Sequence, residues 1–198
     1  MAGRLRLAGP GAAWLALAAL FAVGALAGWT QPAARWDWQP GLAAAQPWRC
    51  WSAAFVHWSA LHLAANLIGL AVVAAFGPVA RLAPRCALAW FIAWPLTQLG
   101  LLLQPALLHY GGLSGVLHAG VAVAAVEMLV RERGRRRAIA LAVLGGLLAK
   151  IALETPWGPP LRHPADWDIP IAPLAHASGA CFGLFCGALA AWLPRRRG

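Results

Sequence analysis

The chain has 198 residues, 61% of them apolar and only 11% charged, and this composition excludes an ordinary soluble domain of that length. The formal net charge is +10, but the basic residues stand in short segments between long apolar stretches. We therefore expect them to set membrane topology and to bind no nucleic acid. The composition predicts a membrane protein whose first partner is the lipid bilayer.

Six apolar stretches follow one another along the chain, each near the length that a helix needs to cross a bilayer. They are residues 12–29, 52–76, 86–103, 113–130, 138–153 and 171–193. The first follows a basic segment, as the apolar part of a signal peptide does, but it is long for that role, and the later stretches alternate across the membrane only if it is retained. We predict one all-α polytopic domain, residues 1–198, with six transmembrane helices.

The Lys and Arg residues are unevenly divided between the two sides of this arrangement. One side holds Arg4, Arg6, Arg81, Arg85 and the runs at 131–137 and 195–197. The loops on the other side, 30–51, 104–112 and 154–170, hold only Arg35, Arg49 and Arg162, with Lys150 near a helix end. Because short cytoplasmic loops carry the excess of basic residues, both termini are expected to be cytoplasmic and these three loops to face outward.

Two of the outward loops have a distinctive composition. The loop 30–51 is rich in tryptophan, and its Trp36, Trp38, Trp48 and Trp51 fit a segment lying at the level of the lipid headgroups. The loop 154–170 is rich in proline, so we expect it to have no regular structure.

Polar side chains inside the predicted spans are the first candidates for function, because they are costly in lipid. They are His57, His62 and Asn66 in the second span, His118 in the fourth and His176 in the sixth. His62 and Asn66 are four residues apart, so a helix presents both on one face and they can point at the same atom. Structural hydrogen bonding between helices is the alternative for this pair.

A serine bracketed by glycines, Gly112-Leu113-Ser114-Gly115, begins the fourth span at its outward end. Glycine allows a tight turn and the close approach of another chain, which a nucleophile attacking a peptide requires. The N–H groups at a helix N-terminus carry partial positive charge and can bind a developing oxyanion. An ordinary helix cap is the alternative for this serine.

The sixth span supplies a base for the serine. If its helix starts near Ile171, His176 lies about 7–8 Å inside, at a depth similar to that of Ser114. A serine needs such a base to be nucleophilic, and neutral imidazole is the usual one. No acidic third member is evident, because Glu127 is about 20 Å from Ser114 along a helix. The sequence therefore predicts a Ser114–His176 dyad.

Taken in order, these residues resemble the rhomboid family of intramembrane serine proteases. The resemblance covers a core from about residue 48 to 193. Its motifs are Trp48-Arg49, His57, His62-xxx-Asn66, Gly112-Leu113-Ser114-Gly115 and Ala175-His176-xx-Gly179. It implies that Ser114 is the nucleophile and His176 the base, and that His62 and Asn66 form an oxyanion hole with the Ser114 amide.

The resemblance also implies supporting roles. Trp48-Arg49 would be the structural motif of the first outward loop, and Gly179 would let the sixth span pack closely on the fourth. One position departs from the family: His118 stands where better-known rhomboids often have a tyrosine that packs on the base. A histidine there can stack on His176, form a hydrogen bond or titrate.

The small size of the chain and its Leu-Ser-Gly-Val-Leu-His stretch (113–118) are similar to rhombosortase, a bacterial rhomboid subgroup linked to proteins with Gly-Gly-containing C-terminal membrane anchors. The resemblance implies an inner-membrane endopeptidase that cuts transmembrane-anchored substrates on the periplasmic side. It implies no cofactor and no metal.

Two other functions are weighed against this one. A catalytically silent rhomboid-like binder of membrane segments would be expected to lack the serine or the histidine, and this chain has both. A haem or metal protein would use His57, His62, His118 and His176 as ligands. Against it, His57 and His62 are five residues apart and would point about 140° apart on one helix.

Overall fold

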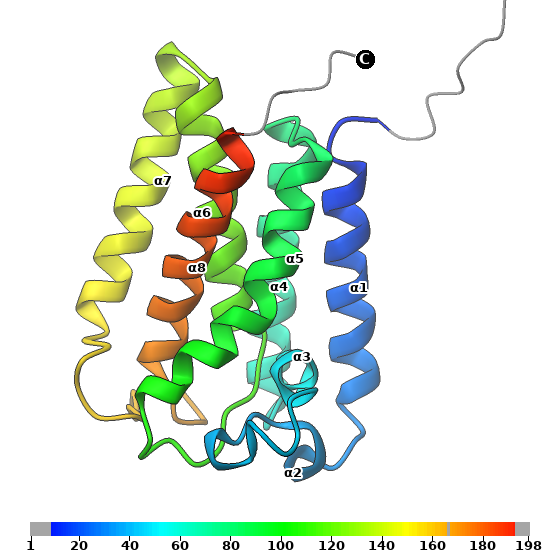
Figure 1. Ribbon diagram of the computed structural model, residues 1–198, viewed down its shortest axis with the longest axis vertical. Coiled ribbons are helices and arrows are strands. Elements are labelled where there is room, and N and C mark those ends of the chain that lie inside the picture. The colour runs from blue at the N-terminus through cyan, green and yellow to red at the C-terminus, as the bar shows by residue number, and fades with distance from the viewer. Residues whose placement is uncertain (1–8, 166, 193–198) are drawn as a thin grey trace, which may run out of the picture.

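The structure, a computed structural model, describes residues 9–165 and 167–192, and in that part the chain is helical with long loops (Figure 1). The long helices of this part are α1 (Ala12–Gly28), α4 (Ala60–Val79), α5 (Pro84–Leu99), α6 (Ser114–Arg131), α7 (Gly134–Leu153) and α8 (Pro173–Trp192). The 3₁₀ helix η3 (Gly100–Leu103) continues α5. Arg4, Arg6 and the 195–197 run, which entered the charge count, lie outside the described residues.

Four of the described helices are long and apolar enough to cross a membrane: α4, α5 together with η3, α6 and α8. This confirms the prediction of an all-α, multi-pass membrane protein. Helix α1 is apolar but has 17 residues, and α7 begins with a run of arginines and carries Lys150 near its end. The six-span count and the orientation therefore stay predictions.

Helices α6 and α8 pack backbone to backbone at the centre of the bundle. A Cβ on Gly179 would lie only 2.0 Å from the carbonyl oxygen of Gly115, and one on Gly183 would lie 2.4 Å from that of Ala119. Such distances leave no room for a side chain, so the two helices approach each other at glycines. Gly179 therefore lies where the backbone of α8 comes into contact with that of α6.

Helix α1 packs against α4 and α5 at one edge of the bundle (Figure 1). The Trp14 ring stacks on that of Trp90 with centroids 4.3 Å apart, and its Nε1 donates a hydrogen bond to the Val73 carbonyl at 2.8 Å. A Cβ on Gly11 would lie 2.3 Å from the backbone of Gly77. These contacts fix α1 to the helix that carries His62 and Asn66.

The second predicted span, 52–76, starts too early. The chain forms the short helices α3 (Arg49–Ser52) and η2 (Ala53–Phe55) before α4 begins at Ala60. Ser59 ends the intervening extended segment, because its side chain caps α4 by accepting a hydrogen bond from the His62 amide at 3.0 Å. The placement of His57 in the same helix as His62 is therefore wrong, since His57 lies in the segment before the cap.

Arg49 organises the loop 30–51, which contains α2 (Ala33–Trp36) and η1 (Pro40–Leu42). Its buried guanidinium donates to the Asp37 carbonyl at 2.8 Å, to the Ala34 carbonyl at 3.1 Å and to Gln46 Oε1 at 2.6 Å. Arg49 therefore serves as the structural centre of the loop, while its neighbour Trp48 is half exposed.

The headgroup-level placement is wrong for one of the loop tryptophans. Trp38 is fully buried and pairs through its backbone with Tyr110, so its indole belongs to the core of the loop. Trp36, Trp48 and Trp51 are exposed, and their position at the headgroups stays a prediction. The loop 154–170 has no helix among its described residues.

Candidate active site

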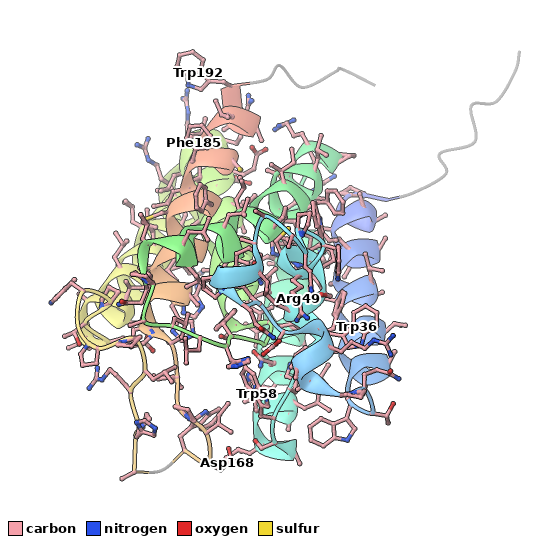
Figure 2. The ribbon with its side chains drawn as sticks, turned by 60° about the horizontal axis from the view of Figure 1, so that its bottom comes forward. Trp36, Arg49, Trp58, Asp168, Phe185 and Trp192 are labelled. Atoms are coloured by element: carbon pink, nitrogen blue, oxygen red, sulfur yellow. The ribbon has the colours of Figure 1, made fainter. Side chains whose placement is uncertain are left out.

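The predicted site residues gather at one end of the bundle, where α4, α6 and α8 all begin (Figure 1). Turned to bring this end forward, Figure 2 shows Arg49, Trp58 and Asp168 there, with Phe185 and Trp192 at the opposite end. Because the three helices start together, side chains in their first turns converge.

Ser114 is the first residue of α6, and a turn at Gly112 places it there. Gly112 has a φ of +116°, which only glycine adopts without cost, and its amide donates a hydrogen bond to the Ala53 carbonyl at 2.9 Å. A Cβ on Gly115 would lie 2.8 Å from the Ala175 carbonyl oxygen. Gly115 therefore lets the first turn of α8 approach Ser114 closely.

His176 faces Ser114 from that turn of α8, with its Nε2 2.9 Å from the serine Oγ. On its other side, His176 Nδ1 lies 2.6 Å from Glu154 Oε2. A carboxylate can only accept, so Nδ1 carries the proton and Nε2 presents its lone pair to the serine. This is the tautomer that a general base requires.

Glu154 is the residue that the sequence analysis missed. It follows the last residue of α7, and its Oε1 also pairs with Lys150 Nζ at 2.5 Å. Burial acts to raise its pKa, but the hydrogen bonds from His176 and Lys150 and the electrostatic attraction of these two groups outweigh burial and lower the pKa of Glu154 to about 2. The expectation that no acidic group reaches the pair is wrong, because Glu154 comes from the end of α7, whereas Glu127 of α6 pairs with Arg85.

His62 and Asn66 line the other side of the serine turn. Both are buried in α4, and their ring Nε2 and amide Nδ2 lie 2.5 Å and 3.5 Å from the position of a Cβ on Gly112. Within the described part of the chain Asn66 Nδ2 has no hydrogen-bond partner. An unpaired buried donor beside a serine is available to a ligand, which fits the predicted oxyanion hole.

His118 stacks on the candidate base, with ring centroids 4.2 Å apart and 11° between the planes. Its Nδ1 donates to the Ser114 carbonyl at 2.6 Å, so the ring is held in place from its own helix. The structure therefore shows two of the interactions expected of a histidine at this position, the stacking on His176 and a hydrogen bond. His57 is buried behind His62, with ring centroids 4.8 Å apart.

A cavity of about 890 Å³ opens beside these residues. Its wall includes Ser114, His176, His62, Asn66 and His118 together with residues of the three loops 30–51, 104–112 and 154–170. Asp37, in the first loop, accepts from His109 Nδ1 at 2.6 Å and from Arg49 at 3.1 Å. This buried carboxylate, to which the sequence analysis gave no role, ties the first loop to the segment that leads into Ser114.

Among the described residues no group of three or more His, Cys, Asp or Glu side chains is arranged to hold a metal ion. His57 and His62 were expected to point about 140° apart on one helix, which would prevent them from binding the same metal. This expectation is wrong, because His57 precedes the first residue of α4. The histidines are instead engaged with one another, with the serine and with backbone carbonyls.

A comparison with models of known protein families matches residues 44–193 to the Rhomboid domain. The chain belongs to the rhomboid family. Rhomboid proteins are generally intramembrane serine proteases, although inactive members exist. The matched region takes in α3 to α8 and leaves out α1, and the comparison with curated proteins found no match.

Proposed function

We propose that this rhomboid protein is an active intramembrane serine endopeptidase in which Ser114 is the nucleophile and His176 the general base. The observation that carries the proposal is the contact of 2.9 Å between His176 Nε2 and Ser114 Oγ, with the imidazole in the required tautomer. A silent family member has no use for a serine and a histidine paired in this way beside a cavity.

The chemistry follows from this contact. His176 Nε2 takes the proton of Ser114 Oγ as the oxygen attacks the peptide carbonyl, and the carbonyl electron pair moves onto its oxygen. When that pair returns, the C–N bond breaks and His176 gives the proton to the departing amine. A water molecule then repeats the sequence on the acyl-enzyme, releasing the new carboxyl end and restoring the serine.

The negative oxygen formed in each half-reaction needs donors that are already in place. The Ser114 amide belongs to the first turn of a helix, where N–H groups have no partner within the helix. Asn66 Nδ2 and the ring of His62 face the same place from α4. We assign these three groups to the oxyanion hole.

The charge distribution supports an arrangement with six spans, both termini in the cytoplasm and the cavity open to the periplasmic side of a bacterial inner membrane. Substrates would then be transmembrane-anchored proteins cut near their outer membrane boundary. The similarity of residues 113–118 to rhombosortase favours substrates with Gly-Gly-containing C-terminal anchors. No cofactor has a part in this mechanism.

The proposal is tested by covalent labelling of the purified protein with a fluorophosphonate, which reacts with an activated serine. We expect labelling of the wild type, none of Ser114→Ala, and a loss on the order of 10³-fold or more in rate for His176→Ala. Retained monodispersity in detergent serves as the control for folding. Absence of labelling in the folded wild type would favour the silent binder.

A further inference from the structure

The catalytic pair lies at one end of a continuous chain of hydrogen-bonding groups contributed by three helices. Ser114 of α6 contacts His176 of α8, His176 contacts Glu154 at the end of α7, and Glu154 contacts Lys150 one turn earlier in α7. The three contacts measure 2.9, 2.6 and 2.5 Å. Proton transfer in the proposed mechanism uses the first contact, the second has so far served only to fix the tautomer of His176, and the third has had no part.

The two oxygens of the Glu154 carboxylate have different hydrogen-bond partners. Oε2 faces His176 Nδ1, and Oε1 faces Lys150 Nζ. Both partners donate hydrogen bonds, so an ionised carboxylate satisfies both at once. The Lys150 ammonium group has no acceptor and can only donate. The Glu154 side chain is only 17% exposed, which limits how far water can take its place.

We propose that Glu154 is the positioning residue of His176, so that the site works as a Ser114–His176–Glu154 triad. This inference rests on the proposed function and adds a residue to it. Glu154 acts through the histidine: it holds the proton on Nδ1, keeps Nε2 aimed at the serine, and stabilises the positive charge that the ring gains when it takes the serine proton.

The arrangement makes a specific prediction for Glu154→Gln. An amide has one accepting oxygen and one donating NH₂ group, and Lys150 can only be satisfied by the oxygen. The NH₂ group is then left facing His176 Nδ1, which must accept, and the ring proton moves to Nε2, where it blocks the base. We expect a loss of about 10³–10⁴-fold in the rate of fluorophosphonate labelling.

A second substitution separates this mechanism from a structural one. Lys150→Met keeps an apolar stem but removes the donor that claims the oxygen. In the double variant Lys150→Met/Glu154→Gln the amide is free to turn its oxygen toward His176 Nδ1. We therefore expect the double variant to label faster than Glu154→Gln alone, whereas accumulated structural damage makes a double variant slower than either single one.

Two further variants complete the experiment. Because Glu154 acts only through the imidazole, His176→Ala/Glu154→Gln should be no slower than His176→Ala. Glu132→Gln is the matched control, since Glu132 forms an ion pair of the same i,i+4 kind with Arg136, and it should label at the wild-type rate.

The outcomes distinguish the inference from the function on which it rests. If Ser114→Ala abolishes labelling while Glu154→Gln labels normally, the protease stands and the positioning role of Glu154 is refuted. A slow Glu154→Gln that Lys150→Met slows further would equally overturn it, because Glu154 would then serve only the fold. Failure of the wild type to label removes the proposed function itself.

Discussion

Substituting Gly179 by alanine tests how strictly the packing of α6 on α8 sets the catalytic geometry. The new Cβ would lie 2.0 Å from the Gly115 carbonyl oxygen, whereas real Cβ atoms essentially never come within 3.0 Å of such an atom. The helices must therefore separate by about 1 Å at this level. Gly115 adjoins Ser114, and Gly179 is one turn from His176, so the separation falls directly on the contact between their side chains.

A misplacement of that size costs about 10²-fold in rate, and overpacking costs about 1–3 kcal/mol of stability. We expect Gly179→Ala to lower the rate of fluorophosphonate labelling accordingly and to reduce the thermal unfolding temperature in detergent. Gly146→Ala in α7 is the control, because a Cβ there meets nothing within 4 Å, and it should leave both quantities unchanged or raise the stability. Wild-type labelling by Gly179→Ala would refute the argument that this contact sets the site.

Two other results are expected. Asn66→Ala and His62→Ala should each reduce turnover of a membrane-anchored substrate by about 10²–10³-fold. Because Asn66 Nδ2 has no hydrogen-bond partner within the described chain, Asn66→Ala should not lower the unfolding temperature. Normal turnover by both variants would exclude the two side chains from the oxyanion hole. In a cysteine-free variant in intact cells, an impermeant thiol reagent should label a cysteine at the exposed position Trp157 and not one at Arg135, and the reverse pattern would invert the proposed orientation.

The local patterns of the sequence were enough to name most of the residues that the structure brings together in the candidate site. Spacing along one helix placed His62 and Asn66 together, and the depth of two helix starts brought Ser114 to His176. Each of these inferences needed only helical geometry and a count of loops. Gly179, by contrast, was named only through the resemblance to the rhomboid family.

Glu154 was missed because its position depends on tertiary structure. It is 22 residues from His176 across a proline-rich loop, and nothing in the sequence states that this loop folds back to join the two helix ends. A signal was present, since Glu154 stands at the end of an apolar stretch, four residues after Lys150, and ionisable side chains at membrane spans are costly. His57 was misplaced for a local reason: the Ser59 cap interrupts an apolar run that reads as continuous.

Helix α1 lies outside the segment that matches the family, yet it is connected to the turn before Ser114 through two backbone contacts. A Cβ on Gly28 would lie 2.4 Å from the carbonyl oxygen of Phe55, so η2 rests directly on α1. In the same turn, the Ala53 carbonyl holds the Gly112 amide just before Ser114. The segment that matches the family, residues 44–193, is therefore shorter than the set of helices that pack together. A fragment cut at residue 44 would keep every residue of the proposed active site and lose the helix against which η2, the hydrogen-bond partner of the Gly112 turn, is packed.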